Sequence, residues 1–491
     1  MKNSHALRTG WTTVDITPTE PVNIRGQFHA RVSEGVRDPL SATALALESG
    51  PPSAPVRLVL VSCDLCGIPD ELRDTVRERV FRQEPELAGA GIVLNATHTH
   101  TGPEMRGDMR EKIDTDVLPG VGGVDLPVQD PGRTLSETAG RIAAAVTQAW
   151  RRRAPGTVAF GVGQAVVGYN RRVCYLDGQS RMYGQVDSPD FSHIEGHEDH
   201  DVGLLACWDG AGKLSGLVVN VACPSQCSES EFMLSADYWH ETRELLRRRL
   251  GRDLFVLPQC AAAGDQSPRP LLCKSAAKRM RDLAGRSERE EIAQRIADAV
   301  CATLPLIETQ RDAMPVVAWQ GGRVDLTRRL LTPDDLEEAQ RDAETWRATY
   351  EKLAQEIEAH PEMRSKPRWY IEITRAYRRM IWNASVQARY EQERRQPRIP
   401  VEVHVLRIGD LALAFNPFEL YLDFGRRIQA RSPALQIMTV QLAGAGTYLP
   451  TVRAVAGRSY GAVPASSPVG PEGGQDLVEH TVARLQELWC V

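Results

Sequence analysis

Several loops of this 491-residue chain hold side chains that could perform chemistry, and each loop follows a short apolar run. Residues 95–103 read Asn-Ala-Thr-His-Thr-His-Thr-Gly-Pro, which puts His98 and His100 on one face of an extended segment. The other loops contribute Cys223, Asp265 with Ser267, Glu419 and Tyr448. This set contains ligands, bases and nucleophiles, and it fits a metal site.

Each of these residues, taken singly, also has an ordinary structural explanation. A lone His-x-His is often structural, a cysteine after a strand is usually buried packing, and Asp265 and Ser267 could cap a turn. Glu419 could stand in the first turn of a helix, and Tyr448 could be a core aromatic. Their shared position after strands favours a functional site, because ligands bind at the carboxyl ends of strands in open α/β sheets.

The apolar runs before these loops are predicted to be buried strands, because they are short, rich in Val, Leu and Ile, and mostly bounded by turn-forming residues. Amphipathic stretches between some of them predict helices. The alternation indicates an α/β fold: a multi-stranded mixed sheet core with helices packed around it, in a single catalytic domain over residues 1–491. The predicted strands are 56–62, 91–94, 202–206, 217–222, 254–257, 411–415 and 437–442, and the helices are 70–82, 134–152, 237–250 and 288–304.

One segment, residues 332–395, is predicted to be an α-hairpin inserted between strands. Thr332 followed by a proline and two acids is a helix start. Apolar or small residues then recur in alternating steps of three and four from Leu336 to Ile357, which predicts a long helix with a narrow apolar seam. A second helix is expected from 367 to 395. The hairpin could be a lid, a dimer contact that makes a homo-oligomer, or a helical layer on the sheet.

Composition and charge exclude several classes of protein. Hydrophobic residues make up 42% and charged residues 25% of the chain, as in ordinary globular proteins. The 59 basic and 64 acidic side chains give a net charge of −5, so there is no electrostatic case for binding nucleic acid. No apolar run approaches the ~18 residues of a membrane helix and no secretory signal is visible, so we expect a cytoplasmic protein without a stable membrane anchor.

The ten cysteines indicate reduced thiols, and no second Cys-x-x-Cys follows residues 63–66, so no zinc knuckle is expected there.

Three stretches resemble the neutral (non-lysosomal) ceramidase family. They are Val-Asp-Ile-Thr-Pro at 14–18, the double-histidine loop at 95–103 and Gly-Asp-Gln-Ser-Pro at 264–268, and they occur in the family's order. The family consists of zinc amidases with an α/β catalytic domain, and the resemblance spans nearly the whole chain. It implies His98, Glu419 and Tyr448 as zinc ligands, His100, Ser267 and Asp265 as catalytic groups, and Arg171 and Tyr460 as substrate-binding groups.

Two features depart from the family's pattern. The family's second ligand histidine follows a strand, and here Cys223 stands in the matching turn, Cys-Pro-Ser-Gln. A thiolate binds zinc at ~2.3 Å and would make the ion a weaker Lewis acid; alternatively, Cys223 is unligated and the site is degraded. The family's C-terminal β-sandwich has no counterpart in this sequence, so we expect a divergent member with the catalytic domain only.

The sequence therefore predicts a zinc-dependent hydrolase that cleaves an amide (N-acyl) bond in a soluble small molecule through a zinc-activated water. His100 would act as general acid or base, and Ser267 would stabilise the oxyanion or attack directly. A carbohydrate-active enzyme on the same scaffold is an alternative, with Asp265 and Glu419 as its carboxylate pair. A non-catalytic pseudoenzyme is another. Long-chain ceramide is not the substrate we expect, although hairpin aromatics such as Trp382 could line an apolar entrance.

Overall fold

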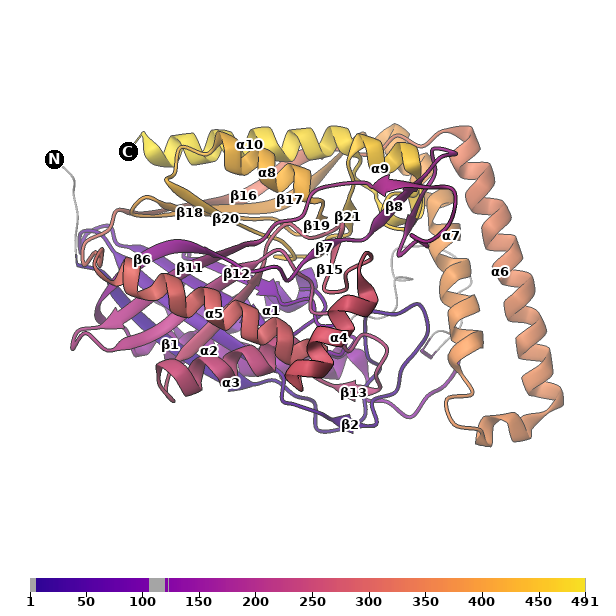
Figure 1. Cartoon of the computed structure of the whole chain (residues 1–491), viewed down its shortest axis with the longest axis horizontal. Helices are drawn as coiled ribbons and strands as arrows, with labels where there is room; N and C mark the ends of the chain where they lie inside the picture. Colours follow the sequence, from indigo (N-terminus) through magenta and orange to yellow (C-terminus); the bar gives the residue numbers. More distant parts are fainter. Residues whose placement is uncertain (1–5, 106–119, 122, 491) are drawn as a thin grey trace.

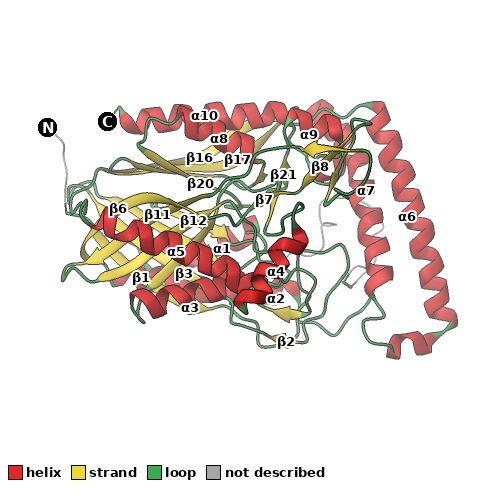
Figure 2. Cartoon of the chain, viewed as in Figure 1, coloured by secondary structure: helices red, strands yellow, loops and turns green. Residues whose placement is uncertain are grey.

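The computed structural model describes residues 6–105, 120–121 and 123–490, and it confirms the α/β fold (Figure 1). Two β-sheets pack face to face at the centre, and helices cover their outer surfaces (Figure 2). The division of the core into two sheets is the feature that the sequence did not reveal. None of the described helices is long and apolar enough to cross a membrane.

The larger sheet has eight strands in the order β14-β12-β11-β6-β1-β3-β4-β5. It consists of two halves, because β1 and β6 share only two residue pairs, Arg8 with Pro155 and Thr9 with Ala154. Each half ends in two parallel strands, β4 with β5 and β12 with β14, while the other neighbours are antiparallel. Its strands are β1 (Arg8–Asp15), β3 (Ser41–Ser49), β4 (Val56–Cys63), β5 (Gly91–Ala96), β6 (Ala154–Gln164), β11 (Asp201–Asp209), β12 (Leu214–Val221) and β14 (Phe255–Cys260).

The smaller sheet has four strands in the order β16-β17-β18-β20, of which β18 and β20 are parallel. An apolar cluster fills the space between the sheets and joins Leu47 and Leu58 of the larger sheet to Leu406 and Met438 of the smaller one. Burial on both faces explains why these strands are continuous apolar runs. The strands are β16 (Val317–Thr327), β17 (Arg398–Ile408), β18 (Leu411–Phe415) and β20 (Gln436–Val440).

Helices cover the outer faces of both sheets. α1 and α2 pack on the half of the larger sheet that holds β1, β3 and β4, and α3 and α5 pack on the other half. α8 and α10 cover the smaller sheet. The four helices predicted from amphipathic stretches are all present. The bounds are α1 (Asp70–Gln83), α2 (Pro131–Arg151), α3 (Tyr238–Leu250), α4 (Lys274–Ala284), α5 (Glu288–Glu308), α8 (Leu422–Arg431), α9 (Val452–Gly457) and α10 (Pro471–Trp489).

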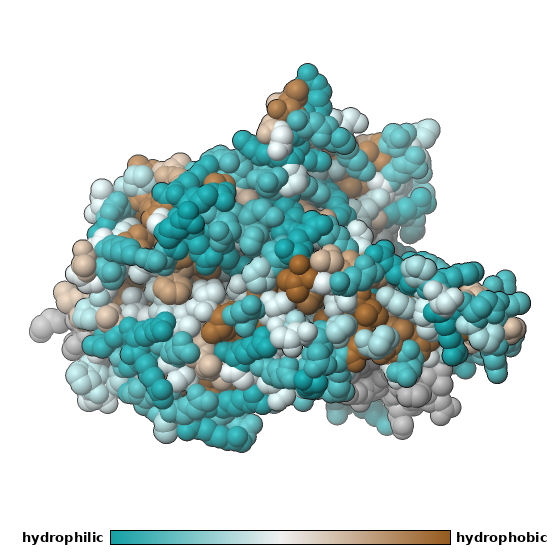
Figure 3. Space-filling view, turned by 90° about the horizontal axis from the view of Figure 1, so that it is seen from below, coloured by the Kyte–Doolittle hydropathy of each residue, from teal (hydrophilic) through white to brown (hydrophobic). Residues whose placement is uncertain are grey.

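The α-hairpin is formed by α6 (Pro333–Ala359) and α7 (Ile371–Arg395), and it projects from one end of the body (Figure 1). Thr332 and Asp335 form a capping box at the start of α6. Trp346 packs against Tyr377 and Ile381 in the seam between the helices, as the apolar spacing predicted. Seen from below, the surface is largely hydrophilic, with separate apolar patches, one of them between the body and the hairpin (Figure 3).

The loops that carry the predicted functional residues meet because parallel strands of both sheets end at one place. The backbone N–H of Ala96, at the end of β5, donates to the carbonyl of Leu442 after β20, at 3.2 Å. The N–H of Gln441 donates to the carbonyl of Cys260, at the end of β14, at 3.0 Å. Short strands continue from this edge into the loops: β2 (Gly35–Val36), β7 (Tyr169–Asn170), β8 (Arg172–Tyr175), β9 (Ser180–Met182), β10 (Phe191–Ile194), β13 (Met233–Leu234), β15 (Gln266–Ser267), β19 (Glu419–Leu420) and β21 (Tyr448–Leu449).

Candidate metal centre and active site

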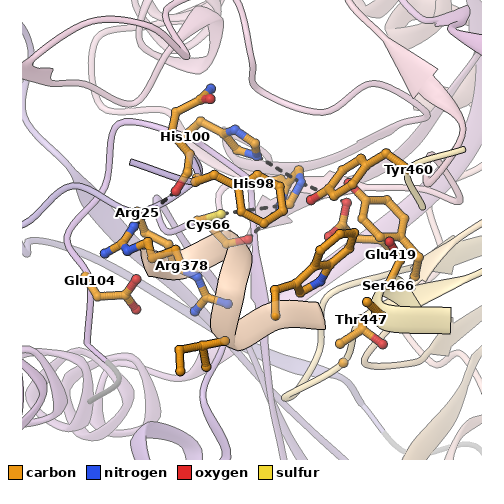
Figure 4. A pocket seen from close by; sticks show the side chains of 18 residues that line it. Arg25, Cys66, His98, His100, Glu104, Arg378, Glu419, Thr447, Tyr460 and Ser466 are labelled. Atoms are coloured by element: carbon orange, nitrogen blue, oxygen red, sulfur yellow. Dashed lines mark hydrogen bonds and ion pairs between the residues drawn. The ribbon is translucent and has the colours of Figure 1, made fainter. Parts of the chain in front are cut away.

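A cavity of about 250 Å³ lies where the strand-end loops meet the hairpin (Figure 4). His98 and His100 enter it from the loop after β5, and Cys66 enters it from the loop after β4. Glu419 of β19 and Tyr448 of β21 line the same cavity, and these two residues are paired in a short parallel ladder. With Tyr460, which also lines the cavity, five of the residues expected at the site from the sequence are therefore brought together.

His98 is at the centre of this group. It has a φ of 65°, a left-handed conformation that is uncommon outside glycine and often marks a functional site. Its Nδ1 lies 2.6 Å from the carbonyl oxygen of Cys66, and because a carbonyl only accepts, Nδ1 carries a proton and Nε2 is the nitrogen that could bind a metal. That Nε2 lies 3.3 Å from Oε2 of Glu419 and 3.3 Å from Nε2 of His100. A carbonyl behind the ring is the usual support of a metal-binding histidine.

The charges of the buried group are strongly coupled. Burial alone would lower the pKa of His98, but the Glu419 carboxylate and the Cys66 thiol outweigh it and raise that pKa to about 10. Burial would raise the pKa of Glu419, but the His98 charge outweighs it and holds the pKa below its usual range. Burial and then the charge on His98 lower the pKa of His100 well below its usual value, so His100 is neutral. The negative charge of the buried Glu419 carboxylate is therefore balanced by a positive charge on His98.

Cys66 is a candidate ligand that the sequence analysis did not select. Its Sγ and one nitrogen each of His98 and His100 lie within 4.8 Å of one another. Cys66 follows β4 as His98 follows β5, and these strands are parallel neighbours. That position past a strand end was the signal that could have identified it, but residues 63–66 were considered only as a zinc knuckle.

Cys223 is not brought into this group. Its thiol lies 3.1 Å from the carbonyl oxygen of Val167 and donates to it, inside the apolar cluster beneath α3 and α5. Burial, above all, raises the pKa of Cys223 well above its usual value, which disfavours the thiolate that zinc binds. The same turn instead presents Gln226, whose Nε2 lies 2.9 Å from Nε2 of His100.

Tyr448 and Tyr460 form one wall of the cavity, with their rings edge to face and centroids 5.3 Å apart. Burial and the charge of Glu419 raise the pKa of Tyr448 well above its usual value. Arg171, expected to bind substrate, lies behind this wall: it donates to the Tyr448 hydroxyl at 3.3 Å and to the carbonyl of Gly264 at 2.9 Å. Arg171 therefore reaches the site through Tyr448.

Asp265 and Ser267, expected to be catalytic, are fully buried and are not among the residues that line the cavity. The Asp265 carboxylate accepts from Asn170 Nδ2 at 2.9 Å and from the Leu422 backbone N–H at 3.0 Å, which ties the loop after β14 to the start of α8. The Ser267 hydroxyl lies 3.2 Å from the hydroxyl of Tyr183. Both residues hold the loops that carry the site.

The hairpin supplies one aromatic side chain, Trp382, to a group of rings that lines the cavity. Trp382 of α7 packs against Phe28, with ring centroids 5.2 Å apart, and Phe28 lies 5.6 Å from Tyr460. All three rings line the cavity. An aromatic residue of the hairpin therefore does face the entrance, whereas Trp346 lies in the seam between α6 and α7.

The residues present fit a zinc ion. Zinc bonds of ~2.0–2.1 Å in a tetrahedron separate neighbouring donor atoms by about 3.3 Å. Nε2 of His98 lies at this distance from both Glu419 and His100. Imidazole, carboxylate and thiol are also the donor types that zinc prefers.

Comparison with protein family models finds no match, and no curated protein sequence matches either. Solved structures do match in fold. A neutral ceramidase from Pseudomonas aeruginosa superposes with a TM-score of 0.68 at 18% identity, over 98% of this chain and 75% of that one. A ceramidase complexed with C2 gives a TM-score of 0.65 at 17% identity, over 98% of this chain and 76% of that one. The chain therefore has the fold of neutral ceramidases, as the sequence resemblance implied.

Proposed function

We propose that this chain, which shares the fold of neutral ceramidases, is a zinc-dependent hydrolase that cleaves an amide (N-acyl) bond in a small molecule. One observation carries the proposal: His98, His100 and Glu419 converge at metal-ligand spacing inside a cavity. Hydrolysis of an amide needs an activated water and a polarised carbonyl, and such a centre serves both needs.

The ion would be held by His98, Glu419 and Tyr448, with Cys66 rather than Cys223 as the cysteine within reach. When bound, zinc lowers the pKa of its water to ~7 and polarises the scissile carbonyl. The Cys66 carbonyl keeps His98 in the tautomer whose Nε2 faces the ion. Because Cys66 supplies both that carbonyl and a thiol, its loop supports the metal in two ways.

His100 would move the proton. It is neutral, and its Nε2 lies beside Nε2 of His98, so it can accept a proton from the attacking water and return it to the leaving amine. Gln226 at 2.9 Å and Glu229 at 3.7 Å orient the ring from either side.

Arg171, Asp265 and Ser267 would act as positioning residues. Arg171 donates to the hydroxyls of both Tyr448 and Tyr183, and Tyr183 in turn lies beside Ser267. This chain of hydrogen bonds fixes the Tyr448 wall relative to the loop after β14. Tyr460 remains the substrate-facing residue of the set, because it lines the cavity.

The alternatives have less support. A glycosidase would need Asp265 and Glu419 to face one substrate, but Asp265 is held by Asn170 and the backbone of Leu422. A non-catalytic, metal-binding pseudoenzyme would hold the ion and cleave neither amides nor glycosides. We also propose that short, water-soluble amides are turned over better than long-chain ceramide. The cytoplasmic location and a homo-oligomer formed through the hairpin remain predictions.

The experiment is hydrolysis of an N-acyl amide panel and an aryl-glycoside panel, with and without a chelator. Amide hydrolysis that the chelator abolishes and zinc restores supports the proposal, and glycoside hydrolysis alone contradicts it. The cysteine assignment is tested separately: Cys66→Ser should lower zinc affinity, and Cys223→Ser should leave it near that of the wild type. The reverse order would return the ligand role to Cys223.

A further inference from the structure

Two arginines, Arg25 and Arg378, line one side of the cavity, and Glu104 is the one acid among the described lining residues that does not belong to the metal group. Arg378 of α7 donates through NH1 to the carbonyls of Gln27 at 3.1 Å and His29 at 3.4 Å, and its buried Nε has no hydrogen-bond partner. Burial would lower the pKa of Arg25, but the charge of Glu104, followed by those of Cys66 and Glu419, outweighs it and raises that pKa, so Arg25 stays cationic. Figure 4 shows both guanidinium groups on the same side of the cavity.

Other arginines of this chain are paired more fully. Arg243 binds the Asp64 carboxylate through two hydrogen bonds of 2.7 and 2.9 Å. Arg289 binds Asp38 at 2.7 Å, and Arg31 donates to four backbone carbonyls. Arg25 and Arg378 are half-buried, and a guanidinium that is partly withdrawn from water without an equal opposite charge costs free energy, which a bound anion would recover.

The charges around Arg25 and Arg378 also favour a bound anion. Burial, and then the charges of Arg375, Arg31 and Arg378, lower the pKa of His29 to about 4, so this wall carries a positive potential. Of the described residues that line the cavity, the acidic ones are Glu104 and Glu419. Glu419 belongs to the metal group, so Glu104 alone offsets Arg25 and Arg378. The cavity therefore has an excess positive charge beside the site of hydrolysis.

We propose that the substrate carries a carboxylate, which Arg25 and Arg378 bind while its amide lies at the His98 group and its apolar part lies against the Phe28 and Trp382 rings. The planar fork of a guanidinium matches a carboxylate, which favours this anion. The substrate class is then a small acidic amide. This inference rests on the proposed amide hydrolysis and specifies its substrate.

The carboxylate could belong to the amine half of the substrate, as in an N-acyl amino acid, or to the acyl half, as in an N-succinyl amine. The experiment compares kcat/KM for an acid with that for its carboxamide, in two pairs. N-benzoylglycine and N-benzoylglycinamide test a carboxylate on the amine half, and an N-succinyl amine and its terminal carboxamide test one on the acyl half. Arg25→Gln and Arg378→Gln are tested beside Arg375→Gln. Arg375 is the matched control, because it lies on the same helix, is paired with Glu372 and does not line the cavity.

We expect the wild type to prefer at least one of the two acids over its carboxamide by about tenfold or more, as charge-assisted hydrogen bonds allow. The acid that is preferred identifies the half that carries the carboxylate. Arg25→Gln and Arg378→Gln should bring the ratio close to one, and Arg375→Gln should leave it unchanged. Equal or faster hydrolysis of both carboxamides by the wild type would overturn this inference and leave the proposed function intact.

If no amide is cleaved, the proposed function fails, and direct binding still decides the inference. Calorimetric titration of the same four compounds into the zinc-loaded protein should then give tighter binding of an acid than of its carboxamide. The difference should be lost in Arg378→Gln and kept in Arg375→Gln, which separates binding to arginine from binding to the metal. Binding without a preference, or a preference that survives Arg25→Gln and Arg378→Gln together, would refute it.

Discussion

Replacing Arg243 by Met should destabilise the protein more than any matched surface change. Arg243 of α3 and Asp64, which follows β4, form a pair of hydrogen bonds at 2.7 and 2.9 Å, with side chains 4% and 0% exposed. The same carboxylate accepts from the Ser41 backbone at 2.8 Å and from Thr97 at 3.3 Å. Asp64 precedes Cys66 by two residues and Thr97 precedes His98, so this pair fixes both loops of the metal group.

The expected loss of stability follows from the burial of the Arg243–Asp64 pair. Removing one partner of a buried ion pair leaves an uncompensated charge and costs about 3–5 kcal/mol. An unfolding entropy of about 2.1 cal/mol/K per residue, applied to the whole chain, converts this to a fall of about 3–5 °C in the melting temperature. Removing both charges, with Asp64→Asn in the Arg243→Met background, should cost less than the two single changes added together.

Calorimetry or thermal denaturation of Arg243→Met beside Arg431→Met tests this. Arg431 forms the same kind of two-bond contact with Glu479, at 2.6 and 2.7 Å, but its side chain is 44% exposed. A surface pair contributes at most about 1 kcal/mol, so Arg431→Met should shift the melting temperature by about 1 °C or less. Arg243→Met should also retain less zinc. If the two variants melt within a degree of each other, the reasoning about the buried pair is wrong.

Three further predictions concern the cavity and its surroundings. Gly26 has a φ of +114°, and a Cβ there would lie 2.5 Å from Cγ of His100, so Gly26→Ala should lower kcat/KM by about tenfold or more. The control is Gly89→Ala, which should leave kcat/KM unchanged, because Gly89 has a similar left-handed φ of +84° but open space around it. Trp382→Ala should raise KM for N-benzoyl substrates more than for N-acetyl ones, since the smaller group does not need the aromatic rings. The pKa of His29 is lowered to about 4 in the folded protein, whereas an unfolded histidine has a pKa of ~6.5. As pH falls, His29 is therefore protonated in the unfolded chain before it is protonated in the folded one, and the free energy of unfolding should decline between pH ~6.5 and pH ~4. Thermal denaturation across this range should show a shallower decline in His29→Gln.

The sequence predicted the fold class and many of its elements, because strong local patterns specify them, but the core strands β3, β6, β16 and β17 were not among the predicted strands. The apolar run at 411–415 coincides with β18, and the seam from Leu336 to Ile357 lies within α6. The packing of two sheets was not predictable in the same way. Burial on both faces gives the same continuous apolar run whether a helix or a second sheet covers the strand.

The site was predicted only in part, because it too depends on tertiary packing that a local pattern does not reveal. His98 and Glu419 were identified because each stands next to a strand end with a distinctive motif. Cys66 and Cys223 both follow strands, and only the direction of the side chain separates them: Cys223 points into an apolar cluster and Cys66 into the cavity. Side-chain direction at the end of a strand depends on tertiary packing. Arg25 carried no signal, because a single arginine in a loop is unremarkable until its place in the cavity beside Arg378 is seen.

The zinc content of the purified protein tests the central claim most directly. Elemental analysis of the wild type grown with zinc should find about one zinc per chain, and His98→Ala should lose most of it while keeping its fold by circular dichroism. Wild-type protein without a transition metal, or a His98→Ala protein that keeps full occupancy, would contradict the account.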